Sequence, residues 1–371
     1  MTTPSGTQEL VLPYAADMHV HLRQGDLMRM VTKLVRPGGV DTVYVMPNLQ
    51  PPITTTEQAL AYRDQLQALE PNVTYLMSLY LSPDLTPEEI RKAAQAGVVG
   101  VKSYPRGVTT NSDAGIESYE TYYPVFQAME EVGMVLNLHG EVPSDRDNGI
   151  CVLNAEKVFL KHLKKLHQAF PRLRIILEHA TTQDAVEMVK SLGDTVGCTI
   201  TVHHLELIVD DWAGFHHNFC KPVAKYPHDR EALRAVIKAG HPRFFLGSDS
   251  APHPRSAKEN VHSCAGVFTS PLVLPYLATL LESFGALDRL QGFACEFGRA
   301  FYGLPLPAPS APTVRLQRMP VAKLSEMEEL PFLVPQSFSF AKDESDAQPS
   351  ASSEVVPFLA GRTLTWRIVE S

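Results

Sequence analysis

Asp17-Met18-His19-Val20-His21 ends the first apolar run of the chain and is the stretch that decides the fold. In a β-strand, residues i and i+2 point to the same face, about 6–7 Å apart along the chain. The imidazoles of His19 and His21 can therefore converge on one metal ion. Arg23 continues the same parity just past the expected strand end, which puts a fixed cation beside that metal. The pattern predicts a catalytic site at the carboxyl end of this strand.

Short apolar or β-branched runs recur after this stretch, separated by segments with helical patterning. Eight strands are predicted, at 14–19, 42–46, 74–81, 98–102, 134–139, 174–179, 198–202 and 244–249. One strand-to-strand unit takes about 34 residues, close to the roughly 31 of a 250-residue barrel. We therefore predict an α/β fold, a (β/α)8 TIM barrel.

Helix signals between the strands support the barrel. Helices are predicted at 56–69, 86–96, 118–132 and 229–239, each with Ser, Thr or Asp at its start. Gly97, Gly133 and Gly240 follow three of them, as left-handed C-caps would. The alternative is an open doubly wound sheet, which usually has a glycine-rich turn after the first strand. The turn here reads His-Leu-Arg-Gln-Gly, so that alternative is disfavoured.

Composition limits the class of protein. The chain has 371 residues, 44% of them hydrophobic, which is compatible with one large α/β domain or two ordinary ones. A net charge of −8 without basic runs argues against nucleic acid and favours a small-molecule partner. Five scattered cysteines and the lack of a basic-then-apolar N-terminus predict a cytoplasmic location. No window approaches the roughly 18 apolar residues of a membrane span.

The texture of the sequence changes after Tyr302. Residues 303–313 are rich in proline, and 342–353 are acidic and rich in serine, which predicts a mobile loop. The runs 313–319 and 362–369 alternate like strands of a small appended sheet. We therefore predict a barrel domain at 1–303 and a C-terminal extension at 304–371 that packs on the barrel.

Four further strand ends carry a side chain able to bind metal. These side chains are Lys102, His139, His179 and Asp249. Every strand of a (β/α)8 barrel opens onto the same catalytic face at its carboxyl end. A single histidine in a strand is more often a structural, hydrogen-bonded residue. Four histidines and an aspartate, all at strand ends, instead predict one metal centre.

This donor set suits zinc and exceeds what one tetrahedral ion with an open position needs, so two ions are implied. A protonated Lys102 beside two cations would be strongly disfavoured. A carbamate, formed from the neutral lysine and carbon dioxide, would instead bridge the metals as a carboxylate.

The remaining histidines are assigned to helix faces, turns and loops. His162 and His167 are placed on a helix, and His228, His241 and His262 in turns. Two pairs surround an expected barrel loop and are interpreted as loop residues, with substrate contact as the less favoured alternative: His203 with His204, and His216 with His217.

Several motifs together resemble the dihydroorotase family, in its short single-barrel branch of the amidohydrolases. They are D-M-H-V-H-L-R, V-M-P-N, G-V-K-S-Y-P, N-L-H-G-E, L-E-H and L-G-S-D-S-A-P-H. The resemblance spans about 14–303, with a weaker echo at 357–369. Only 18 residues precede His19, too few for the N-terminal β-sandwich of hydantoinases and dihydropyrimidinases.

The resemblance implies a reaction and a metal centre. The reaction is the reversible cyclisation of N-carbamoyl-L-aspartate to L-dihydroorotate in de novo pyrimidine (UMP) biosynthesis, by a homodimer. His19, His21 and Asp249 would bind one zinc and His139 and His179 the second. N6-carboxylated Lys102 and a hydroxide would bridge the two zinc ions. Asp249 would also be catalytic, by moving the proton.

The resemblance also implies a substrate site. Arg23, Asn48 and His253 would hold the substrate carboxylate, and the main chain at Lys221, Ala265 and Gly266 would bind the ring. Thr109 and Thr110 match a mobile loop that closes over the substrate. Lys221 stands where some relatives are expected to have an apolar residue, so the role of its side chain is open.

Three rival functions remain open from sequence alone. Lys102 could be a Schiff-base nucleophile, as in aldolases. The chain could be an inactive homologue with a scaffolding role, although every ligand position is filled. It could also be another cyclic amidase such as a hydantoinase, whose substrates lack the carboxylate that Arg23 is placed to bind.

Overall fold

A computed structural model describes residues 8–108, 111–112, 115–116, 118–319, 332–340 and 353–369. Thr109, Thr110 and the predicted acidic loop up to residue 352 lie outside these described residues. Nine parallel strands follow one another: β2 (Ala15–Val20), β3 (Val40–Val45), β4 (Thr74–Leu76), β5 (Ser78–Tyr80), β6 (Gly100–Ser103), β7 (Val135–His139), β8 (Arg174–Glu178), β9 (Val196–Ile200) and β10 (Phe244–Leu246).

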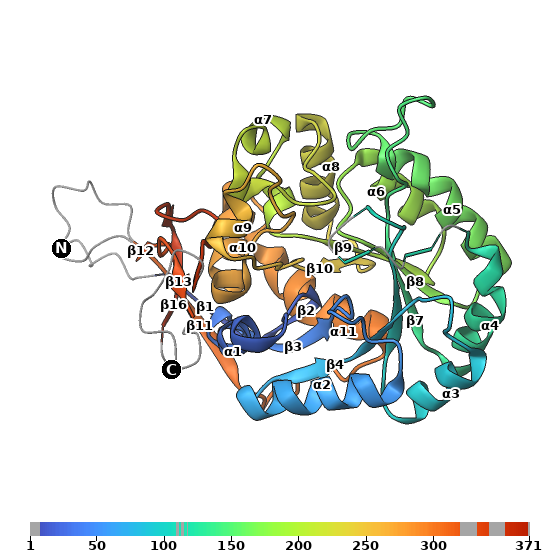
Figure 1. The fold of residues 1–371 in the computed structure, drawn as a ribbon. Coiled ribbons are helices and arrows are strands. Elements are labelled where there is room, and N and C mark those ends of the chain that lie inside the picture. The colour runs from blue at the N-terminus through green and yellow to red at the C-terminus, as the bar shows by residue number, and fades with distance from the viewer. Residues whose placement is uncertain are drawn as a thin grey trace, which may run out of the picture.

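The strands close into a barrel. Two sheets, β2-β3-β4 and β5 to β10 in chain order, are joined where Met77 separates β4 from β5. A parallel bridge between Val20 and Ser250 brings the segment after β10 back to β2. With β4 and β5 counted as one interrupted strand, the predicted eight-stranded (β/α)8 fold is confirmed (Figure 1).

Most of the helices lie around the outside of the barrel, and α11 (Phe297–Tyr302) packs against the barrel interior through Tyr302 (Figure 1). The helices are α1 (Gly25–Lys33), α2 (Thr56–Leu69), α3 (Pro87–Gln95), α4 (Tyr123–Val132), α5 (Ala155–Ala169), α6 (Gln183–Ser191), α7 (Val209–Trp212), α8 (Pro227–Lys238), α9 (Arg255–Lys258), α10 (Val273–Ser283) and α11 (Phe297–Tyr302). No helix in the described part of the chain is both long and apolar enough to cross a membrane.

The predicted helices are present, with two displaced starts. A 3-10 turn occupies 120–122, so α4 begins at Tyr123 and not at 118. The last of the four predicted helices, α8, begins at Pro227 because proline is favourable in a first turn. Asp229 is its third residue, and its carboxylate accepts the amide hydrogen of Tyr226 at 3.3 Å. Gly97, Gly133 and Gly240 have φ of +83°, +76° and +68°, which confirms the predicted C-caps.

Two buried clusters explain the hydrophobic patterning. The smaller contains Met18, Tyr44, Ile176 and Phe245, which come from strands on opposite sides of the barrel and pack together. The larger contains the other faces of the strands and the inner faces of the helices. Because a barrel strand is covered on both faces, every residue of β2 is buried, including the polar ones. The chain therefore places His19 in an interior environment.

An antiparallel sheet flanks the barrel. It consists of β1 (Glu9–Pro13), β11 (Thr313–Arg318) and β16 (Trp366–Val369), with β11 in the centre. The alternating runs at 313–319 and 362–369 thus do pair, but the contribution of β1 was not predicted. Two short pairs complete the extension: β12 (Phe332–Leu333) with β15 (Thr363–Leu364), and β13 (Phe338–Ser339) with β14 (Glu354–Val355). The domain boundary at 303 stays a prediction.

Candidate active site

Closure of the barrel brings Asp249 to the first strand. The predicted strand 244–249 is too long, because β10 ends at Leu246 and Asp249 lies in the following loop. The amide of Asp249 donates to the carbonyl of His19 at 2.9 Å, and the amide of His21 donates to Ser250 at 3.0 Å. Asp17 accepts the amide hydrogen of Ser248 at 2.7 Å. These bonds place Asp249 beside both histidines.

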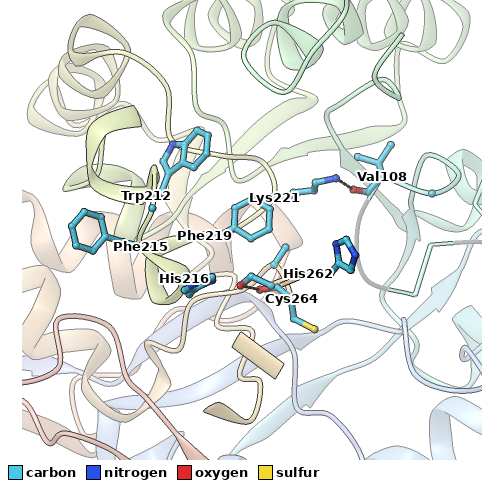
Figure 2. Close-up of a pocket in the computed structure, with 12 residues that line it drawn as sticks. Val108, Trp212, Phe215, His216, Phe219, Lys221, His262 and Cys264 are labelled. Carbon is cyan, nitrogen blue, oxygen red and sulfur yellow. Dashed lines mark hydrogen bonds between the residues drawn. The ribbon is translucent and has the colours of Figure 1, made fainter. Parts of the chain in front are cut away.

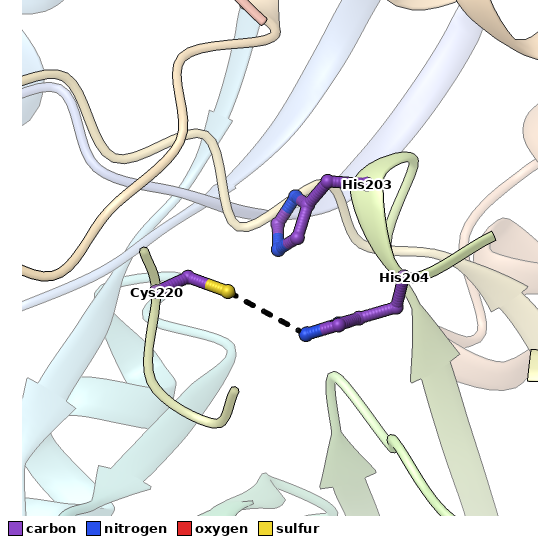
Figure 3. Close-up of side chains that lie close together, drawn as sticks. All are labelled: His203, His204 and Cys220. Atoms are coloured by element: carbon purple, nitrogen blue, oxygen red, sulfur yellow. Dashed lines mark hydrogen bonds between the residues drawn. The ribbon is translucent and has the colours of Figure 1, made fainter. Parts of the chain in front are cut away.

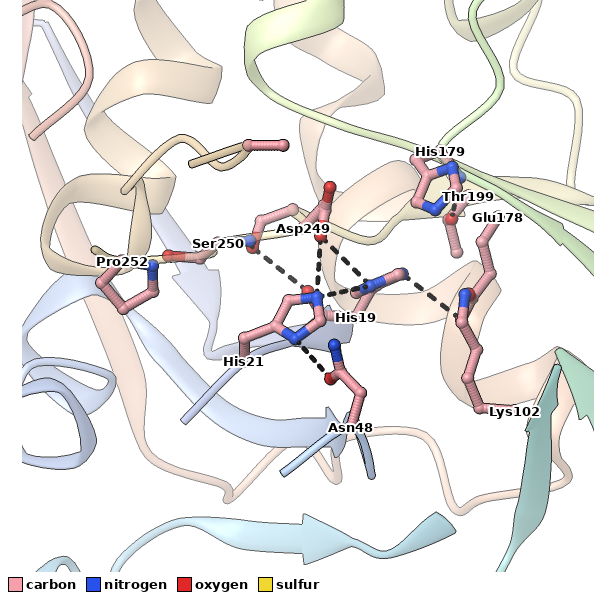
Figure 4. A network of polar contacts seen from close by, with 12 residues as sticks. His19, His21, Asn48, Lys102, Glu178, His179, Thr199, Asp249, Ser250 and Pro252 are labelled. Atoms are coloured by element: carbon pink, nitrogen blue, oxygen red, sulfur yellow. Dashed lines mark hydrogen bonds and ion pairs between the residues drawn. The ribbon is translucent and has the colours of Figure 1, made fainter. Parts of the chain in front are cut away.

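Three donor atoms meet at this point (Figure 4). Nε2 of His19 and Nε2 of His21 are 3.3 Å apart, and Oδ1 of Asp249 lies 3.2 and 3.1 Å from them. Zinc bonds of 2.0–2.1 Å in a tetrahedron give ligand edges of about 3.3 Å. The spacing of this triad is therefore that of three ligands of one zinc ion.

The protonation of His21 also fits metal binding. Its Nδ1 lies 2.9 Å from Oδ1 of Asn48, and an amide oxygen only accepts, so Nδ1 carries the proton. Burial lowers the pKa of His21 to about 3, which keeps the ring neutral. Its Nε2 therefore presents a lone pair toward Asp249, and Asn48 orients the ring as partners of ligand histidines usually do.

The other predicted ligands lie beside this triad. Ring centroids are 5.1 Å apart between His19 and His179, and 4.7 Å between His179 and His139. Nδ1 of His179 is buried and has no hydrogen-bond partner among the described residues. Lys102 is fully buried, and its Nζ contacts the carboxylate of Glu178, which lies 3.3 Å from Nδ1 of His19. All six predicted ligands therefore belong to one buried cluster.

Electrostatics at Lys102 favour the neutral amine. Burial lowers the pKa of this lysine well below its usual value, against the opposing charge of Asp249. The pKa of Asp249 is held well below its usual value: burial would raise it, but His19 and His21 outweigh that effect. The cluster therefore combines neutral nitrogen donors with an ionised carboxylate, the ligand types that zinc binds.

Strained backbone marks the same residues. Arg23, His179 and Asp249 have φ of +62°, +42° and +48°, in the left-handed region that residues other than glycine rarely adopt. Each such residue costs about 1–3 kcal/mol, and such strain gathers at functional sites. Here it turns side chains at the ends of three barrel segments toward one cavity.

Two basic side chains stand at the rim of this cavity. Nη2 of Arg23 lies 3.1 Å from Nε2 of His253, and that same nitrogen lies 3.0 Å from the carbonyl of Ala265. Burial and the Arg23 guanidinium lower the pKa of His253 to about 2, so its ring is neutral. One ring nitrogen cannot both accept from Arg23 and donate to Ala265. An anion that accepts from both side chains would resolve this conflict.

The predicted ring-binding residues line the cavity too. Lys221, Ala265 and Gly266 border the inner cavity together with the histidines, Arg23, Asn48 and Asp249. The side chain of Lys221 donates to the carbonyl of Val108 at 2.8 Å. This bond provides a role for the side chain that the sequence left open, since it anchors the segment leading to Thr109.

An outer pocket of about 600 Å³ lies beside the inner cavity and shares Lys221 and Ala265 with it. Figure 2 shows its aromatic lining, with Trp212, Phe215 and Phe219 on one side. Because the two spaces share these residues, the outer pocket adjoins the inner cavity.

Both histidine pairs lie in the loop after β9, as predicted, but the first pair is buried. His203 and His204 follow β9, are 0% and 2% exposed, and lie near Cys220 (Figure 3). Nε2 of His204 lies 3.0 Å from the carbonyl of Pro222, and its Nδ1 lies 2.9 Å from the Thr201 hydroxyl. Both nitrogens of His204 are thus engaged, so we interpret His204 as structural, whereas neither ring nitrogen of His203 has a hydrogen-bond partner among the described residues. His216 and His217 do lie at the surface, in a 3-10 turn.

Two carboxylates in the quoted motifs were not singled out from sequence. Glu178 contacts both Lys102 and His19, and Glu141 lies 2.8 Å from Nε2 of His139. The signal was present, because Glu178 directly precedes His179 and Glu141 follows His139 by two residues. Carboxylates that orient ligand histidines are common around zinc.

A barrel with a histidine and carboxylate cluster at its carboxyl end defines a metal-dependent hydrolase. Residues 16–260 match the amidohydrolase family. A dihydroorotase from Mycosarcoma maydis is 55% identical, with 98% of this chain and 99% of that protein covered. One from Saccharomyces cerevisiae is 45% identical, with 97% and 98% covered. The crystal structure of Saccharomyces cerevisiae dihydroorotase with 5-fluoroorotic acid has a TM-score of 0.87 and 44% identity, over 98% of each chain. The chain belongs to the dihydroorotase family of cyclic amidohydrolases.

Proposed function

We propose that this chain catalyses the reversible closure of N-carbamoyl-L-aspartate to L-dihydroorotate in pyrimidine synthesis. We also propose that it uses two zinc ions bridged by N6-carboxylated Lys102. The observation that carries the proposal is the triad of His19, His21 and Asp249, with donor atoms 3.1–3.3 Å apart in a cavity rimmed by Arg23. Similarity over almost the whole length to dihydroorotases supports the substrate.

Binding of the substrate carboxylate falls to Arg23 and His253. The guanidinium of Arg23 is held in place, since its Nε donates to the carbonyl of Pro252 at 2.9 Å. Its Nη2 and the imidazole of His253 then form a pair of donors for one carboxylate. Asn48, which orients His21, is proposed as a third contact. The site thereby selects cyclic amides that carry a carboxylate and orients their ring toward Asp249.

Asp249 is proposed to move the proton. When bound, two zinc ions polarise an amide carbonyl and lower the pKa of water to about 7. In ring opening, the Asp249 carboxylate accepts a proton from the attacking water and then donates it to the departing ring nitrogen. In ring closure, the same carboxylate takes the proton from the ureido nitrogen and returns it to the oxygen that leaves the carboxyl carbon as water. Its strained backbone and the bond from its amide to His19 hold it in place for both steps.

Metal removal is the direct test of this proposal. Treating the purified protein with dipicolinate should lower the rate of dihydroorotate ring opening, followed by ultraviolet absorbance, by about 10³-fold. The loss corresponds to the several kcal/mol that metal ions supply. Adding zinc back should restore the rate, and mass spectrometry should count two equivalents per chain. Full activity in protein shown to be free of metal would refute the proposal.

A second test addresses the carboxylate. Arg23→Met should lower kcat/KM for dihydroorotate about 10- to 150-fold, because a charge-assisted hydrogen bond contributes about 1.5–3 kcal/mol. Activity on dihydrouracil, which has no carboxylate, should not fall with it. Arg36→Met is the matched control, since that guanidinium stacks on Tyr14 away from the cavity. Equal losses on both substrates would contradict this role and favour a hydantoinase-like specificity.

We also propose a homodimer in the cytoplasm. The dimer rests on the resemblance to the family, and light scattering tests it. The compartment rests on the scattered cysteines, which form no disulfide among the described residues.

A further inference from the structure

Lys258, the last residue of α9, buries its ammonium where three main-chain carbonyls meet. The residue is 4% exposed, and Nζ donates to the carbonyls of Phe219, Cys264 and Gly266 at 2.8, 2.9 and 2.8 Å. An ammonium has three donors, and all three are used. No carboxylate within the described ranges forms an ion pair with Lys258, so its charge is compensated by the carbonyl dipoles together with the Phe219 ring, whose centre lies 5.9 Å from Nζ. Burial lowers its pKa to about 8.

The three carbonyls come from two loops that both border the inner cavity. Phe219 precedes Lys221 in the loop after β9, and Cys264 and Gly266 flank Ala265 in the loop after β10. A direct bond also joins the loops, from the amide of Gly266 to Phe219 at 3.0 Å. The amides of Lys221 and Ala265 have no hydrogen-bond partner in the part of the chain described here. These are two unpaired main-chain donors at the cavity.

The loop around Ala265 needs an external constraint to keep its conformation. The carbonyls on either side of Ala265 point to Lys258, whereas that of Ala265 itself lies 3.0 Å from Nε2 of His253. Gly266 has φ of +154°, and a Cβ there would come within 2.3 Å of the carbonyl of Ala251. Glycine is required for this path, but glycine also permits many others. The bonds to Lys258 select the observed one.

We propose that Lys258 is a positioning residue that fixes the main-chain amides of Lys221 and Ala265 as donors to the ring oxygens of a cyclic amide substrate. The identity of the ring rests on the proposed function. The role of Lys258 in fixing the two loops does not depend on it. Lys258 acts through the backbone and does not touch the substrate. Its loss should therefore weaken substrate binding more than it slows the chemical step.

The test compares a buried and a partly buried cation that bind carbonyls at opposite ends of the barrel. Lys258→Met removes the ammonium at the cavity. Arg243→Met is the matched control, because that guanidinium donates to the carbonyls of Val189, Gly193 and Val196 at the amino end of β10. Each variant is assayed for KM and kcat with dihydroorotate, for zinc content and melting temperature, and by hydrogen exchange of segments 219–221 and 264–266. Lys258→Gln, which keeps two donors, replaces Lys258→Met if that variant does not fold.

The expected result is a KM raised about tenfold or more in the Lys258 variant, with kcat within threefold and two zinc ions retained. Exchange in both segments should be faster. Arg243→Met should lower the melting temperature and leave KM within twofold. Unchanged KM and exchange in the Lys258 variants would overturn the proposal, as would an equal rise of KM in Arg243→Met. If wild-type protein lacked dihydroorotase activity, the proposed function would fail, and exchange alone would decide the role of Lys258.

Discussion

Lys102→Ala should reduce the rate of dihydroorotate ring opening by about 10³-fold or more and lower the zinc content below two per chain. The side chain is fully buried, lies 4.7 Å from the centre of the Tyr104 ring and contacts Glu178 beside His19. As a carbamate it would add a carboxylate that both metals share. Without the carbamate, the shared carboxylate would be lost and the histidines would not hold both ions. The loss of metal would remove several kcal/mol of transition-state stabilisation.

A rescue experiment separates this role from simple damage. The alanine variant leaves space where a small carboxylate can replace the carbamate, so acetate or propionate should restore part of both the zinc content and the rate. Removal and return of carbon dioxide during metal loading of the wild-type protein should change the zinc content in parallel. A variant that keeps two zinc ions and near wild-type turnover would contradict the bridge. Trapping of wild-type protein by borohydride with substrate would favour the Schiff-base alternative.

The barrel was predictable because its signals are local. Each strand is predicted by an apolar run. Three helix ends are each predicted by one glycine, at Gly97, Gly133 and Gly240. The features of the fold that were not predicted depend on contacts between residues distant in the sequence. Met77 interrupts one predicted strand, and β1 pairs with β11 across some 300 residues, which no periodicity reveals.

The candidate site follows the same division. Five of the predicted ligands lie at or within one residue of a strand end: His19, His21, Lys102, His139 and His179. They are predicted to lie together because all strands of a (β/α)8 barrel end at the same face. Asp249 lies three residues beyond β10, and long-range bonds such as the bridge from Ser250 to Val20 bring it into the triad.

Residues that act through other residues were harder to predict. Lys258 lies in a polar stretch of sequence, which is typical of an exposed segment. In the structure it is buried, and one of the carbonyls that bind it belongs to Phe219, which is distant in the sequence. Glu178 was not singled out because the motif was already explained by its neighbour His179, which was assigned as a metal ligand.

Asp249→Asn should lower kcat about 10³-fold in both directions while KM changes less than threefold. Asparagine keeps the size of the side chain and an oxygen near His19 and His21, but it cannot carry a proton between the water and the ring nitrogen, a role that typically contributes 10²–10⁴-fold. Zinc content, measured on the same sample, shows whether the metals stay, and Asp249→Glu tests whether a carboxylate at a different reach recovers part of the rate. Asp145→Asn is the matched control, since within the described residues that carboxylate accepts hydrogen bonds from Asp147 and Asn148 of its own turn alone. An Asp249→Asn enzyme with two zinc ions and more than about a tenth of the wild-type kcat would show that another group moves the proton.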